Sequence, residues 1–211
     1  MRKDRDKVQA RVGRGRPRAF DPDQALACAM RLFWNKGFEA TSIASLTKAM
    51  GVGSTSLYAT FNSKGELYQA ALNRYVELYG RLVWSRFHKA GSARDAAHAF
   101  LHDTAVAVTG GERGLPRGCM ATLATVSDED HASLGDLIRA GRTGAFDLLK
   151  ARFQRGVNDG DLPSRADPDL LARFVQTVHS GMSIRARDGA DCAELCAVAD
   201  MAMAGWDRMV E

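Results

Sequence analysis

The sequence has 211 residues, of which 45% are hydrophobic and only five are proline, so it contains enough apolar side chains to build a folded core. Four cysteines without the spacing of a disulfide framework favour a reducing compartment. No apolar run approaches the ~20 residues of a transmembrane helix, and the first 20 residues lack the apolar segment of a signal peptide. We therefore expect a cytoplasmic protein with no membrane association.

The net charge of +4 is distributed unevenly along the chain. Residues 1–20 contain eight lysines and arginines against two aspartates, whereas the rest of the chain contains 21 basic and 23 acidic side chains. A cationic segment on a nearly neutral body favours a polyanionic partner at that end of the molecule. A segment that only raises solubility would carry the same charge, and this is the alternative interpretation.

The basic segment, residues 1–19, is expected to form an arm without regular structure because it is too polar to build a core. Its stretch GRGRPR, residues 13–18, resembles the core of an AT-hook. Glycine lets the backbone lie flat, proline holds it extended, and arginine side chains can enter a narrow minor groove. The predicted DNA contacts of the arm are Arg14, Arg16 and Arg18.

Residues 20–66 are expected to form three short helices. Capping residues, glycines and apolar spacing indicate their ends: Asp21 and Gly37 for the first, Thr41 or Ser42 and Gly51 for the second, and Ser54 for the start of the third. Because only three or four residues separate the helices, successive helices must cross steeply. This is the geometry of a helix-turn-helix domain.

The third of these helices lies in GVGSTSLYATFNSKGELY, residues 51–68, and presents small hydroxyl-bearing side chains and one tyrosine. Small side chains allow close approach of DNA, and their hydroxyls can bind phosphates or base edges in the major groove. Tyr58 is long enough to reach the phosphate backbone. A helical hairpin inside a larger bundle is the alternative, but it leaves the basic arm unexplained.

The stretch AMRLFWNKGFEATSIASLTKAMGVGSTSLYATFNSKGELYQAAL, residues 29–72, resembles the DNA-binding domain of TetR-type transcriptional regulators. The resemblance implies phosphate contacts from Thr41, Ser42, Tyr58 and Lys64, and base contacts from Ser54, Thr55 and Thr60. The sequence departs from the family pattern at Thr47, where a smaller residue is usual, and at Gly53, where a larger one is common.

The remainder, residues 67–211, is expected to form a helical body, which makes the whole fold all-α. Ser63 and Glu66 form a capping box that opens a helix running to about His88. Further helices are predicted at 92–109, 118–126, 130–158, from Pro168 to about Arg187, and from Asp191 to about Val210. No segment shows the alternation of a strand.

The resemblance also implies that this body binds an effector and that its last two helices pair with a second copy of the chain. Apolar and small residues permit such a seam, although they also suit the core of one subunit: Phe174, Val175, Val178, Gly181, Met182, Ile184, Cys196, Ala197, Met201, Ala204 and Gly205. The implied function is that of a one-component regulator, a repressor. It would bind a palindromic operator as a homodimer, leave it when a small-molecule effector binds, and require no cofactor.

Cysteine and histidine side chains offer a second way to sense a signal. His98 and His102 lie one helical turn apart, so both could face one metal ion, although packing or solvent exposure is the simpler interpretation. Cys119 begins a predicted helix beside Arg117, and both features would lower its pKa. The short RGCM stretch around it resembles an element of copper-responsive TetR-type repressors, so a thiol- or metal-responsive regulator is the alternative function. A small buried hydrophobic role is the simpler interpretation of Cys119, and Cys28 is expected in the core of the first helix.

Enzymatic functions find little support in the sequence. The glycine-rich GVGSTS lacks the lysine of a phosphate-binding loop and follows a helix rather than a strand. No serine has the spacing of a nucleophile elbow. A small all-helical enzyme is the alternative from another class, and turnover of a substrate without DNA would distinguish it.

Overall fold

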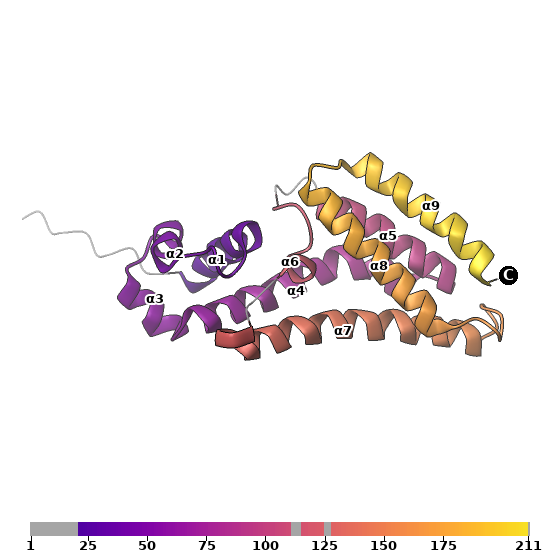
Figure 1. The fold of residues 1–211 in the computed structure, drawn as a ribbon, viewed down its shortest axis with the longest axis horizontal. Coiled ribbons are helices and arrows are strands. Elements are labelled where there is room, and N and C mark those ends of the chain that lie inside the picture. The colour runs from indigo at the N-terminus through magenta and orange to yellow at the C-terminus, as the bar shows by residue number, and fades with distance from the viewer. Residues whose placement is uncertain (1–20, 111–114, 125–127, 211) are drawn as a thin grey trace, which may run out of the picture.

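The computed structural model describes residues 21–110, 115–124 and 128–210 of the chain. These residues contain the helices α1 to α9 and no strand, which confirms the predicted all-α fold. Figure 1 shows α1, α2 and α3 grouped at one end, α5, α8 and α9 at the other, and the long helices α4 and α7 running between the ends. Among the described helices, none combines the length and the apolar character that a bilayer crossing requires.

The amino-terminal group consists of α1 (Pro22–Lys36), α2 (Ile43–Met50) and α3 (Ser54–Phe61). Asp21 and Ser42 cap α1 and α2 by accepting hydrogen bonds from amides of the first turn. Gly51 ends α2 with φ at 68°, in the left-handed region where glycine is unstrained. The three predicted helices and their order are therefore confirmed.

Helix α4 (Lys64–Lys89) connects this group to the rest of the molecule. Ser63 caps it by accepting a hydrogen bond from the Glu66 amide, as the capping box predicts. Near its start, the buried Tyr68 ring packs edge-on against Phe33 and Phe38, with centroid separations of 5.0 and 5.2 Å. These contacts join α4 to the helix-turn-helix group, so movement of α4 would be transmitted to it.

The body contains α5 (Ala93–Val108), α6 (Met120–Leu123), α7 (Asp128–Asn158), α8 (Pro168–Arg187) and α9 (Cys192–Val210). Helix α5 lies in its centre and packs against α4, α8 and α9. The prediction of a helix at 118–126 was wrong in length, because α6 has only four residues. Ala124 is extended, and the Arg142 guanidinium of α7 binds the carbonyls of Ala121 and Ala124, so these carbonyls find partners outside a helix.

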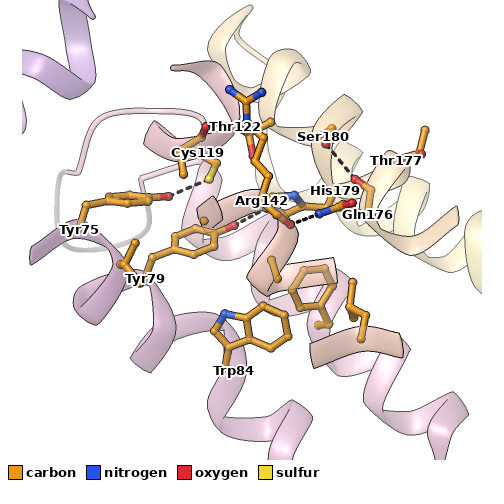
Figure 2. Close-up of a pocket in the computed structure, with 16 residues that line it drawn as sticks. Tyr75, Tyr79, Trp84, Cys119, Thr122, Arg142, Gln176, Thr177, His179 and Ser180 are labelled. Carbon is orange, nitrogen blue, oxygen red and sulfur yellow. Dashed lines mark hydrogen bonds between the residues drawn. The ribbon is translucent and has the colours of Figure 1, made fainter. Parts of the chain in front are cut away.

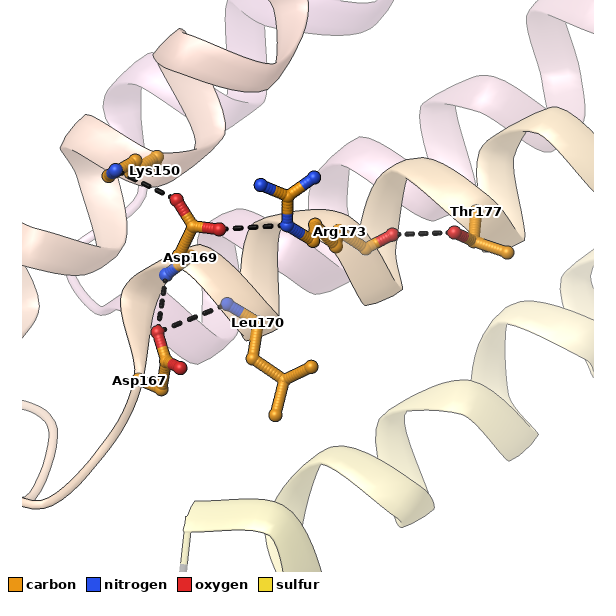
Figure 3. Close-up of polar contacts among 6 residues, drawn as sticks. All are labelled: Lys150, Asp167, Asp169, Leu170, Arg173 and Thr177. Carbon is orange, nitrogen blue, oxygen red and sulfur yellow. Dashed lines mark hydrogen bonds and ion pairs between the residues drawn. The ribbon is translucent and has the colours of Figure 1, made fainter.

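Polar contacts fix the start of α8 (Figure 3). The Asp167 carboxylate accepts hydrogen bonds from the amides of Asp169 and Leu170, which caps the helix. Asp169 binds Lys150 of α7 and Arg173 one turn along α8, each at 2.8 Å. The Lys150 hydrogen bond, followed by the Arg173 contacts, lowers the pKa of Asp169 against the opposing effect of desolvation. The resulting stabilisation is present at neutral pH and is lost as the pH falls through that lowered pKa.

Helices α8 and α9 leave an apolar face in contact with solvent. Its large exposed side chains are Leu170, Ile184, Val198 and Met201, with Met201 76% exposed. At Gly181 and Gly205 no atom lies within 4 Å of the position that a Cβ would occupy, so another helix could approach the backbone closely there. Of the residues predicted for a subunit seam, Val175 and Met182 are instead buried in the core of this chain.

The expectation that Cys28 lies in the core of the first helix was wrong. The Cys28 side chain is exposed. The buried face of α1 is centred on Ala29, Met30 and Phe33, and the helical rotation places Cys28 on the opposite side.

Candidate functional site

Helix α3 presents the predicted recognition surface. Leu57 is its buried residue and holds the helix in the core, while Ser54, Thr55 and Thr60 are exposed and Tyr58 is 44% exposed. The helix is preceded by Gly53, whose lack of a side chain leaves the first turn without a side-chain cap. The amides of this turn can therefore bind an anion such as a DNA phosphate.

Two further predicted phosphate contacts flank α3. Ser42 is exposed at the start of α2, where its hydroxyl accepts a hydrogen bond from the Ser45 amide. The Lys64 ammonium lies 4.2 Å from the centroid of the Phe38 ring, at the start of α4. Desolvation lowers the pKa of Lys64, and the nearby Glu39 carboxylate partly opposes this effect.

The predicted phosphate contact from the Thr41 side chain does not fit the structure. This side chain is fully buried, and its hydroxyl donates a hydrogen bond of 2.6 Å to the Gly37 carbonyl. The hydroxyl thus supports the turn between α1 and α2 and has no access to DNA in this conformation. Arg14, Arg16 and Arg18 lie outside the described residues.

A cavity of about 310 Å³ lies in the body between α4, α5, α6, α7 and α8. Its size is within the range of small-molecule sites. Figure 2 shows the side chains that line it, and polar groups interrupt a mainly apolar wall: Tyr75, Tyr79, Trp84, Cys119, Thr122, Arg142, Gln176, Thr177, His179 and Ser180.

The Cys119 thiol is 3% exposed and lies at this cavity. The Tyr75 hydroxyl donates a hydrogen bond of 3.1 Å to its sulfur, and the Tyr79 hydroxyl shares one of 2.9 Å with His179 Nε2 (Figure 2). Burial by itself raises the pKa of Cys119, but His179, followed by Thr122 and Tyr75, outweighs it and lowers the pKa to about 7. A large fraction of the thiol is then deprotonated near neutral pH, and the thiolate is the reactive form.

The cause of this lowered pKa differs from the one that the sequence suggested. Arg117 binds the carbonyls of Gly189 and Ala190, so its charge serves the connection between α8 and α9. The groups that lower the pKa are His179, Thr122 and Tyr75. Of these, His179 and Tyr75 are 60 and 44 residues away from Cys119 in the chain. No local pattern in the sequence brings Tyr75 and His179 to Cys119, and sequence reasoning missed both of these distant partners.

The cavity is linked to the helix-turn-helix group through the residue before Cys119. The Gly118 carbonyl accepts a hydrogen bond of 2.8 Å from the buried indole of Trp34 in α1. Arg187 of α8 donates to the carbonyls of Trp34 and Asn35 at the end of the same helix. Gly118 has φ at 78°, and an added Cβ would lie 2.9 Å from the Ser183 carbonyl oxygen, so a larger residue does not fit here.

His98 and His102 lie together on α5, as their spacing predicts. Their rings stack with centroids 4.2 Å apart. Asp200 of α9, which sequence reasoning missed, is 2.7 Å from His102 Nε2 and 3.8 Å from His98 Nε2. Desolvation, followed by the neighbouring His102, lowers the pKa of His98 against the opposing effect of Asp200. The two histidines therefore have a carboxylate partner.

Comparisons with known proteins identify the family. A model described as bacterial regulatory proteins, tetR family, matches residues 25–71. The chain is 32% identical over 200 residues to the HTH-type transcriptional repressor ComR of Escherichia coli (strain K12), with 94% of each chain covered. It is 33% identical over 198 residues to the repressor BdcR of the same strain, with 93% of each covered. The chain belongs to the TetR family.

A solved structure of another TetR-family member supports the same assignment. It contains a cysteine-substituted variant of the regulator CifR complexed with 26-base-pair operator DNA. It is 38% identical to this chain, has a TM-score of 0.84, and covers 91% of this chain and 100% of that one. This TetR-family chain is therefore a transcriptional regulator and not an enzyme, so the alternative of a helical enzyme is discarded.

Proposed function

We propose that this TetR-family chain is a transcriptional repressor that binds a palindromic operator as a homodimer and leaves it when an effector occupies the α4–α8 cavity. Similarity along almost the whole chain to two repressors supports the proposal, as does the operator complex of CifR. The observation that carries it is the exposed hydroxyl surface of α3, with its uncapped first turn, beside the buried core of the helix-turn-helix group. A dimer would present two such helices about one DNA turn apart.

The proposed DNA contacts follow from the polar groups that each side chain presents to solvent. Ser42, Tyr58 and Lys64 would bind phosphates, while Ser54, Thr55 and Thr60 would meet base edges. Arg14, Arg16 and Arg18 of the arm would add minor-groove contacts at the flanks of the operator. We retain residues 1–19, 20–66 and 67–211 as the arm, the DNA-binding domain and the effector domain.

Footprinting of the promoter beside the protein's own gene tests this function. We expect a protected palindrome, and light scattering of the complex should give an even number of chains per operator. Fluorescence anisotropy at fixed salt would then compare the palindrome with an unrelated duplex of equal length, because phosphate contacts alone bind both. Equal affinity for the two duplexes would refute sequence-specific repression.

The cavity indicates the class of effector. Its aromatic wall favours a small, mainly apolar molecule, and Arg142, Gln176 and His179 offer hydrogen bonds that would orient it. Effector binding would favour the conformation of the protein that binds the effector more tightly. If that conformation binds the operator less well, a coupling free energy of a few kcal/mol between the two sites changes operator occupancy tenfold or more. Operator binding itself requires no cofactor in this proposal.

The second candidate is a thiol-responsive repressor that uses Cys119. The observation that favours it is a thiol whose pKa is lowered to about 7 at the wall of a cavity that a small electrophile can enter. Attack by the thiolate on an alkyl halide would form a carbon–sulfur bond, break the carbon–halogen bond and release the halide ion. The alkyl group then left on the sulfur would lie beside Gly118. Because Gly118 binds Trp34 of α1, this group would press on the helix-turn-helix domain. The same thiolate could instead serve as a ligand for a soft metal ion such as Cu(I).

A further inference from the structure

Two imidazoles and one carboxylate converge on the surface between α5 and α9. Each of His98, His102 and Asp200 offers a ligand atom, and these atoms lie within 4.8 Å of one another. The side chains of His98, His102 and Asp200 are 43, 24 and 63% exposed, so an ion can reach them from solvent. Helices α5 and α9 lie side by side at the end of the molecule opposite α1–α3, which places the cluster far from the DNA-binding surface (Figure 1).

The distances suit a tetrahedral ion. Ligands ~2.1 Å from such an ion lie ~3.4 Å from one another. The two separations from Asp200 Oδ1, 2.7 Å to His102 Nε2 and 3.8 Å to His98 Nε2, lie on either side of that value. Small rotations of the side chains would therefore bring all three atoms into ligand positions.

We propose that His98, His102 and Asp200 form a Zn²⁺ site that joins α5 to α9. Two imidazoles with one carboxylate are a ligand set that zinc accepts, and water would complete the tetrahedron. Zinc binds the neutral form of an imidazole through a ring nitrogen. The site is separate from the Cys119 cavity and does not depend on the proposed response to an effector.

The neighbouring charges are compatible with a cation at this position. Arg94 and Arg86 are the positive side chains that act on His98. The Arg86 guanidinium holds both oxygens of Asp103 at 2.9 and 3.0 Å. That carboxylate offsets the Arg86 charge next to the site. The Asp200 carboxylate supplies a negative charge that favours a divalent cation at this position.

The test is a zinc titration of the metal-free full chain against a chromophoric chelator. Wild type should bind one ion per chain, and Zn²⁺ should raise its thermal unfolding temperature because the ion binds only the folded state. His102→Ala should weaken binding about tenfold or more and remove the rise in unfolding temperature. His98→Ala provides the same test with a more exposed residue if His102→Ala does not fold. Unchanged zinc affinity in a folded variant would overturn the proposal.

Two controls separate this site from other ligands in the chain. His88→Ala removes an exposed histidine of α4 and should leave affinity and stoichiometry unchanged. The sulfurs of Cys192 and Cys196 lie 4.0 Å apart on α9, so they are the competing pair of soft ligands. A Cys192→Ser, Cys196→Ser double variant should retain zinc binding. Loss of binding in this double variant, with retention in His98→Ala, would assign the zinc to the thiols and overturn the proposal.

Discussion

At the scale of single residues, the surroundings of Cys119 and Cys28 give two cysteines different chemistry. Cys28 is exposed on the outer side of α1. Cys119 is buried, yet His179, followed by Thr122 and Tyr75, stabilises its charged form enough to lower its pKa to about 7. A position that looks like a small core residue in the sequence thus carries a reactive group at a cavity.

The rate of alkylation of Cys119 by iodoacetamide should rise as the pH increases through about 7, because only the thiolate attacks and its pKa is lowered to about that value. A thiol with an ordinary pKa of about 8.5 would be almost wholly protonated at the same pH. Mass spectrometry of the modified peptide, between pH 5.5 and 9, measures this rate. Cys28 in the same sample is the internal comparison, and Cys119→Ser should lose the labelled peptide.

Labelling of Cys119 that rises only above pH 8 would contradict the lowered pKa. Absence of labelling at any pH, in protein that labels at Cys28, would show that the cavity does not admit the reagent. Either result would remove the support for a thiol response.

Tyr58→Phe should weaken operator binding evenly across operator variants, because its hydroxyl is predicted to bind a phosphate and carries no base information. The expected loss is about 1.5 kcal/mol, the lower end of the range for one hydrogen bond to a charged group. Anisotropy titrations with the operator and its single-base variants measure both effects. Thr55→Ala is the matched comparison on the same helix, and it should change the preference among bases.

An unaltered affinity in folded Tyr58→Phe would remove Tyr58 from the phosphate contacts. A change in base preference in that variant would instead place its hydroxyl at a base edge.

At the scale of elements, helix ends were predictable because they depend on neighbouring residues. Asp21, Ser42 and Ser63 cap their helices through bonds within three residues, and Gly51 ends α2 through its own backbone conformation. The length of α6 was not predictable, because it depends on Arg142, about twenty residues away. The partners of Cys119 were hidden for the same reason, and the burial of Thr41 depends on how the first two helices pack.

Asp167→Ala should lower the free energy of unfolding by about 1 kcal/mol, because it removes the cap of α8. Asp169→Asn, two residues later, should have a smaller effect, since its ion pairs with Lys150 and Arg173 lie in contact with solvent. Urea unfolding of both variants at pH 7 makes the comparison. A larger loss for Asp169→Asn would show that the ion pairs, and not the cap, stabilise this end of the helix.

Trp34→Phe should reduce the effect of an effector on DNA binding, because it removes the indole that holds the Gly118 carbonyl beside the cavity. The buried carbonyl would lose its partner, so the free energy of unfolding should also fall by about 1–3 kcal/mol. The coupling is the ratio of operator affinities with and without saturating effector, measured by anisotropy. Asn35→Ala, an exposed neighbour on α1, is the control.

Coupling of the same size in wild type and Trp34→Phe would show that the signal does not pass through the Trp34–Gly118 contact. The Arg187 contacts with the end of α1 would then be the remaining connection.

At the scale of the whole molecule, the cavity lies between the helices that lead to two surfaces: the DNA-binding surface of α3 and the exposed apolar face of α8 and α9. Its wall includes residues of α4 and of α8. Helix α4 begins three residues after the last residue of α3, and α8 carries part of the exposed apolar face. In a homodimer that pairs α8 and α9 with their copies, a shift of α4 against α8 would change the separation of the two α3 helices. Operator affinity depends on that separation because both helices must reach successive major grooves.

The central claim, that events in this cavity control operator occupancy, is tested most directly by measuring operator anisotropy for wild type and Cys119→Ser, each with and without an alkylating agent or Cu(I). We expect the agent to release DNA from wild type and not from Cys119→Ser, while an apolar cavity ligand releases DNA from both. Equal responses of the two proteins to the agent would eliminate Cys119 as the switch. Wild type that stays on the operator after complete labelling of Cys119, and with the cavity filled, would contradict the claim itself.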